Sequence, residues 1–124
     1  MSSPSRYQQP HDPLYKECAA RAALDVITGR WKPSLLFEIK DGPKRFSELQ
    51  AAVPGISAQA LAMQLRQLEA DGVIARFVYN ESPVRVEYSM TEFGATLSEL
   101  MDQLTVWGIS YLERRGRQGD KTTK

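Results

Sequence analysis

The chain has 124 residues, of which 42% are hydrophobic and 25% charged, and its formal net charge is +1. This length and composition indicate one globular domain, and no apolar run approaches the roughly 18 residues that cross a bilayer. One cysteine and one histidine exclude an intrachain disulfide and argue against a Cys/His zinc site. We therefore expect no metal, no cofactor and no membrane partner. The polar N-terminus lacks the apolar stretch of a secretory signal, which favours a cytoplasmic protein.

The first third of the chain predicts a flexible arm followed by two helices. Residues 1–13 are polar and rich in proline, a composition that does not order itself alone. From Cys18 to Ile27 apolar residues recur at spacings of three and four, which predicts a helix that ends at Gly29. Pro33 suits the first turn of a second helix, which we expect to reach about Lys40.

Two further helices are expected, with a tight turn between them. Ser47 is the predicted cap of a short third helix through Val53, after which Pro54-Gly55 breaks the chain. Ser57 is the predicted cap of a fourth helix that ends near Asp71. The inner face of this fourth helix is expected to carry Leu61, Leu65 and Leu68.

The rest of the chain predicts a β-hairpin and a long helix. Residues 74–79 and 86–90 have strand-like patterns and are joined by a polar loop. Thr91 can cap a last helix that extends to about Arg115, with a flexible tail over 116–124. The order of elements predicts a mainly α fold with a small β-hairpin wing (α+β). This is the winged helix-turn-helix plan, in one domain over residues 14–115.

The fourth helix is the candidate for reading double-stranded DNA. A recognition helix needs an apolar face on its domain and a short polar face toward the base edges. Glutamine pairs with adenine in the major groove, and alanine lets the helix approach closely. The expected reading residues are Ser57, Gln59, Ala60, Met63 and Gln64. A solvated glutamine face is the alternative, but the hairpin that follows favours DNA reading.

Cations on the neighbouring elements are candidates for phosphate contacts, which supply most of the non-specific affinity for DNA. They are Lys44, Arg45, Arg66, Arg76 and Arg85. Alternatively, Arg66 and Arg76 pair with Glu69 or Asp71. The net charge of only +1 argues against DNA binding. It supports a second hypothesis, a winged-helix module that binds a protein or a small molecule. No constellation of residues indicates an enzyme.

The last helix carries an apolar stripe that resembles the seam of a coiled coil. Its predicted interface residues are Leu97, Leu100, Leu104, Trp107 and Tyr111. A second copy of the helix would cover the stripe with two-fold symmetry, so we expect a homodimer. The first helix is expected to contribute to this interface. The alternative is a stripe that packs only on its own domain.

Cys18 is a candidate redox-sensing residue. It is predicted to lie at the start of a helix, where N–H groups stabilise a thiolate, and Lys16 and Arg21 are near it in sequence. The alternative is a buried and inert thiol, which is the commoner fate of a lone cysteine.

Several ordered motifs together resemble the HxlR-type winged-helix regulators. They are Cys18, Gly29–Lys32, Arg45–Leu49, Pro54–Ser57, Leu65–Glu69, Asp71–Arg76, Pro83, Val86–Gly94 and Trp107–Gly108, and they cover about residues 15 to 112. The resemblance implies a homodimer that binds pseudo-palindromic operators and dimerises through its first and last helices. Several members sense electrophiles or oxidants through a cysteine placed like Cys18. Here Ala19 replaces the proline that often follows it, and any disulfide must be intermolecular or with a small thiol.

Overall fold

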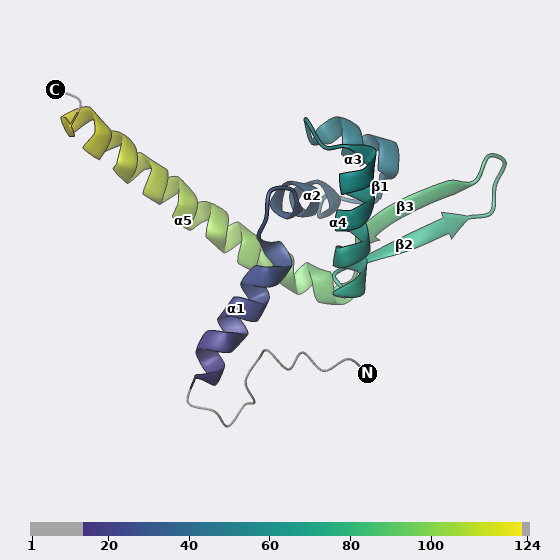
Figure 1. The fold of residues 1–124 in the computed structure, drawn as a ribbon, viewed down its shortest axis with the longest axis horizontal. Coiled ribbons are helices and arrows are strands. Elements are labelled where there is room, and N and C mark those ends of the chain that lie inside the picture. The colour runs from purple at the N-terminus through teal and green to yellow at the C-terminus, as the bar shows by residue number, and fades with distance from the viewer. Residues whose placement is uncertain (1–13, 123–124) are drawn as a thin grey trace.

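A computed structural model describes residues 14–122, and its elements follow the predicted order (Figure 1). They are α1 (Tyr15–Ile27), α2 (Lys32–Ile39), β1 (Lys44–Arg45), α3 (Phe46–Ala52), α4 (Ala58–Ala70), β2 (Ile74–Tyr79), β3 (Arg85–Met90) and α5 (Glu92–Thr122). The strands form one antiparallel sheet in the order β1-β3-β2. The predicted mainly α fold with a β-hairpin wing is therefore confirmed. The predicted arm over residues 1–13 lies outside the described residues.

Local chemistry explains where α4 begins and which side it buries. The Ser57 hydroxyl accepts a hydrogen bond from the backbone N–H of Ala60 at 3.0 Å, as predicted for the cap of this helix. Leu61, Leu65 and Leu68 are almost fully buried, which confirms the predicted inner face. With leucines and isoleucines of α2 and α3 they form the core on which α4 is held.

Three of the predicted element boundaries were wrong. The first helix begins at Tyr15 rather than Cys18, and the last continues past Arg115 to Thr122. The third helix begins at Phe46, and Ser47 does not cap it. Instead the Glu48 carboxylate accepts the backbone N–H of Arg45 at 2.8 Å. A carboxylate three residues into a helix can bond back to the N-cap residue, which here replaces the hydroxyl cap.

The start of α5 is fixed to the turn between α4 and β2. The Thr91 backbone N–H donates to the Val73 carbonyl at 3.1 Å, and the Thr91 hydroxyl donates to the Gly72 carbonyl at 2.6 Å. The same hydroxyl accepts the N–H of Gly94, as predicted for a cap. A Cβ atom at Gly94 would overlap the Val73 carbonyl, so only glycine fits this close approach.

The helices α1 and α5 leave the body of the domain on the side opposite the wing (Figure 1). The α5 helix has 31 residues, which is about 46 Å of helix, and its second half extends beyond the rest of the domain. Within residues 14–122, no helix is long and apolar enough to span a membrane.

Candidate nucleic-acid interface

The exposed side of α4 carries most, but not all, of the predicted reading residues. Gln59 is exposed, and 50% of the Met63 surface is accessible. Ser57 is exposed at the N-cap, where its hydroxyl accepts one hydrogen bond and keeps a proton to donate. Ala60 is partly buried and packs against the core, and Gln64 is also partly buried. The outward face therefore centres on Gln59 and Met63, and Gln64 lies at its edge.

Arg66 and Arg76 line one polar cleft between α4 and the wing. Glu69 and Tyr88 line the same cleft, which has a volume of about 420 Å³. Both arginines are exposed, and none of the ion pairs within residues 14–117 includes either of them. The predicted alternative, in which they pair with Glu69 or Asp71, therefore does not occur in this part of the chain. Two guanidinium groups remain available to an anion at this cleft.

Lys44 and Arg45, the two cations before α3, differ in their side-chain contacts. The Lys44 ammonium donates to the backbone carbonyl of Glu38 at 2.9 Å and is partly buried, so this side chain ties β1 to α2. Arg45 is exposed, and its strand position pairs with Glu87 of β3. Sequence reasoning missed β1 because a strand of two residues has no periodic signal.

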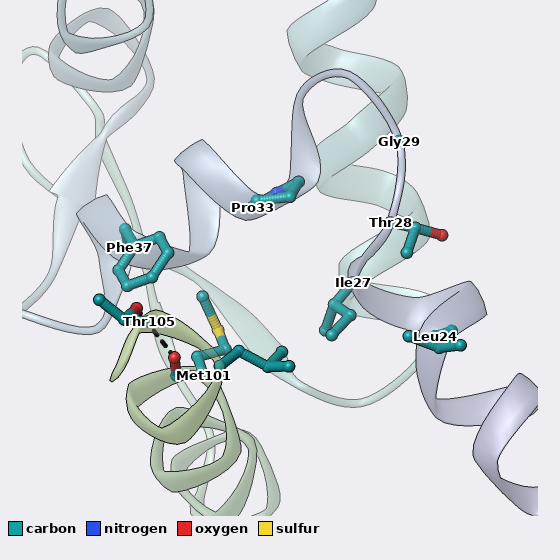
Figure 2. Close-up of a pocket in the computed structure, with 9 residues that line it drawn as sticks. Leu24, Ile27, Thr28, Gly29, Pro33, Phe37, Met101 and Thr105 are labelled. Carbon is teal, nitrogen blue, oxygen red and sulfur yellow. Dashed lines mark hydrogen bonds between the residues drawn. The ribbon is translucent and has the colours of Figure 1, made fainter. Parts of the chain in front are cut away.

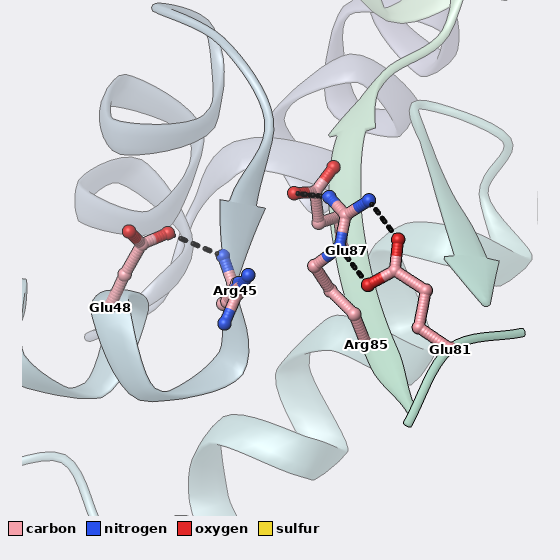
Figure 3. Close-up of polar contacts among 5 residues, drawn as sticks. All are labelled: Arg45, Glu48, Glu81, Arg85 and Glu87. Atoms are coloured by element: carbon pink, nitrogen blue, oxygen red, sulfur yellow. Dashed lines mark hydrogen bonds and ion pairs between the residues drawn. The ribbon is translucent and has the colours of Figure 1, made fainter. Parts of the chain in front are cut away.

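Arg85, predicted to contact phosphate, lies between two carboxylates at the far end of the wing (Figure 3). Its guanidinium donates twice to Glu81, at 2.9 and 3.3 Å, and once to Glu87, at 2.6 Å. It also lies over the ring of Tyr79, 3.9 Å from the centroid. Hydrogen bonding from Arg85 lowers the pKa of the Glu81 carboxyl below its usual value, so Glu81 is ionised at neutral pH.

The predicted interface stripe on α5 is largely exposed. Leu100, Leu104, Trp107 and Tyr111 are exposed, and the last two rings stack with centroids 5.5 Å apart. Leu97 is the exception, since it is partly buried against the core of its own domain. Sequence reasoning missed that other sides of the same helix are also apolar and exposed, at Val106, Ile109 and Leu112.

An apolar pocket of about 420 Å³ opens where α1, α2 and α5 meet (Figure 2). Leu24 and Ile27 of α1, Phe37 of α2, and Met101 and Leu104 of α5 are among the residues that line it. Leu104 belongs to both this pocket and the stripe, so the two form one continuous apolar surface. Sequence reasoning did not find the pocket, because it forms only when three separate helices meet.

Cys18 is half-buried and forms no disulfide. Because α1 begins earlier than predicted, the Cys18 N–H is not one of the unpaired groups of the first turn. It donates to the Leu14 carbonyl at 3.0 Å. Arg21 pairs with Glu17 at 3.3 Å. The predicted position at the helix start was therefore wrong.

Comparisons with known proteins agree with the fold and with these motifs. The model of the HxlR-like helix-turn-helix family matches residues 26–116. YdeP of Bacillus subtilis (strain 168), named an uncharacterized HTH-type transcriptional regulator, is 45% identical over 100 residues, or 81% of this chain and 78% of YdeP.

Two solved structures extend the comparison. The redox regulator HypR in its reduced form has a TM-score of 0.75 and 43% identity, covering 80% of this chain and 98% of HypR. The crystal structure of a MarR-family transcriptional regulator from Enterococcus faecalis V583 has a TM-score of 0.78 and 36% identity, covering 89% of this chain and 97% of that one. The chain therefore belongs to the HxlR-like helix-turn-helix family of transcriptional regulators.

Proposed function

We propose that this regulator binds a pseudo-palindromic DNA operator as a homodimer, with α4 of each protomer in the major groove. The observation that carries the proposal is the exposed face of α4 beside the cleft of Arg66 and Arg76. Side chains of Ser57, Gln59 and Met63 contact base edges, while the two arginines contact the phosphate backbone. Arg45 is a further phosphate contact.

The homodimer is supported by the apolar surface of α5. From Leu104 to Leu112 the helix is apolar on nearly every side, and 67% of the Trp107 surface is exposed in a single copy. A helix with this pattern is normally buried on all sides. A second copy, whose own α1 and α5 carry the same residues, covers this surface and the adjoining pocket with two-fold symmetry.

The direct test is fluorescence anisotropy with DNA from upstream of the gene and of its divergent neighbour, against a scrambled competitor and over a salt series. We expect saturable binding that resists the competitor and weakens with salt. Gln59→Ala should relax the preference at one base pair and weaken the correct site by about 1–3 kcal/mol. Gln103→Ala, an exposed change on α5, is the control and should bind as wild type.

Absence of DNA binding even at low salt would contradict the proposal and favour the second hypothesis, an interaction module. Equal affinities of Gln59→Ala and wild type for every operator variant would instead show that base reading lies elsewhere on α4.

Redox or electrophile sensing through Cys18 is a second proposal. It is favoured by the partial exposure of Cys18 on α1 and by 43% identity to the redox regulator HypR. The helix α1 also lines the apolar surface proposed for dimerisation. A modification of Cys18 would therefore act on the distance or angle between the two copies of α4.

A further inference from the structure

We propose that Glu81 and Glu87 withhold Arg85 from DNA, so that phosphate binding by the β2–β3 wing is confined to Arg76, beside Arg66 of α4. The inference rests on the DNA-binding function proposed above. It assigns to two acidic residues of the wing a role in keeping non-specific affinity low, and thus in raising specificity.

The hydrogen-bonding capacity of Arg85 is largely used within the wing. Guanidinium–carboxylate pairs are charge-assisted, and the pair with Glu81 is bidentate, which holds the planar group in one orientation. Glu87 takes a further donor, and Tyr79 covers one face of the group. Only 25% of the Arg85 side chain is exposed. A phosphate would have to displace two carboxylates to reach it.

The carboxylates also cancel the positive charge on this face of the wing. Arg45 lies opposite Glu87 in the sheet, so two guanidiniums and two carboxylates together carry no net charge. A phosphate that approaches the end of the wing therefore meets no net attraction. An arginine there without neighbouring carboxylates would attract the backbone of any DNA sequence.

The strand register places the two arginines of the wing on opposite faces of the sheet. Arg76 lies opposite Tyr88, and both line the cleft with α4. Tyr79 lies opposite Arg85, three positions along β2 from Arg76 and therefore on the other face. Since α4 enters the groove in the proposed complex, a phosphate beside it meets Arg76 rather than Arg85.

The test compares variants of the full chain by anisotropy on scrambled DNA over a salt series. We expect the double variant E81Q/E87Q to bind scrambled DNA roughly 3–10-fold more tightly. The slope of log affinity against log salt concentration should become steeper by about one, because one more phosphate is neutralised. Arg85→Ala should keep the salt slope of wild type, because a guanidinium paired with two carboxylates neutralises no phosphate. Arg76→Ala and Arg66→Ala should each flatten the salt slope by about 0.9.

Two controls separate release of Arg85 from a simple change in net charge. The double variant E99Q/E113Q removes the same two charges from exposed positions on α5 and should not reproduce the gain. Adding Arg85→Ala to E81Q/E87Q should abolish the gain, because the released guanidinium is its cause.

A flatter salt slope for Arg85→Ala alone, or equal affinities of E81Q/E87Q and E99Q/E113Q, would overturn the inference and leave the proposed function intact. Wild-type protein that binds no DNA at low salt would overturn both.

Discussion

Cys18 lies one turn inside α1, and this position changes which groups can activate its thiol. The N–H groups that favour a thiolate belong to the preceding residues, and Arg21, the arginine near Cys18 in sequence, is paired with Glu17. The start of α1 therefore activates the Cys18 thiol less than the sequence predicted. A sensing role for Cys18 is still supported by its partial exposure on α1, a helix that adjoins the proposed dimer surface.

If Cys18 is a sensor, diamide should change the affinity for the operator, and Cys18→Ser should abolish that change. Diamide takes up two hydrogen atoms as two thiols join in a disulfide, here between two protomers or with a small thiol. The measurement is operator affinity before and after diamide, followed by addition of a reductant. Reversal by the reductant is expected, and an identical response of Cys18→Ser would remove Cys18 from the mechanism.

The residue types of the site could be predicted better than the partners of each residue. Arg66 and Arg76, both predicted as phosphate contacts, lie in one cleft. The role of Arg85 could not be settled in the same way, because Glu81 reaches it across a loop whose path the sequence does not specify. Glu87 is different. Residues two apart in a strand share a face, so the contact between Arg85 and Glu87 could have been predicted from the strand pattern.

At the scale of elements, Gly94 tests how α5 is joined to the domain. Gly94→Ala should destabilise the fold by about 1–3 kcal/mol, because the new Cβ overlaps the backbone carbonyl of Val73, which cannot rotate away. Urea unfolding at one protein concentration measures the change.

Gly116→Ala is the matched control for that change. No atom lies within 4 Å of the Cβ that it would add, and alanine favours a helix over glycine. Its free energy of unfolding should be equal to or slightly above that of wild type. Equal stability of Gly94→Ala and Gly116→Ala would mean that α5 does not pack on Val73 as described.

Elements with a strong local signal were predicted well, and those that depend on distant contacts were not. Ser57 and its leucines define α4 by capping and periodicity alone. The strand β1 exists only because Lys44 and Arg45 pair with β3, far along the chain. The end of α5 was placed too early because Gly116 resembles a stop, although a single glycine costs a helix only about 1 kcal/mol.

For the whole molecule, the central prediction is that a charge on the apolar stripe separates the dimer. Leu104→Glu should sediment as a monomer and lose most of its operator affinity, because one protomer binds only one half-site. Gln103→Glu adds the same charge at the adjacent exposed position and should remain a dimer. A wild-type protein that sediments as a monomer at micromolar concentration would contradict the proposed assembly.

The attachment of α5 to Gly72 and Val73 has a consequence for the operator. The helix α4, proposed to read bases, and the helix α5, proposed to hold the partner, meet at one turn and are joined there by the Thr91 hydrogen bonds. In the proposed dimer, the two copies of α4 are therefore held at a fixed separation, which we expect to be ~34 Å, the length of one DNA turn. An extra base pair between half-sites shifts them by about 3.4 Å and also rotates one around the helix axis. Such an operator should be discriminated against as strongly as one with a wrong base.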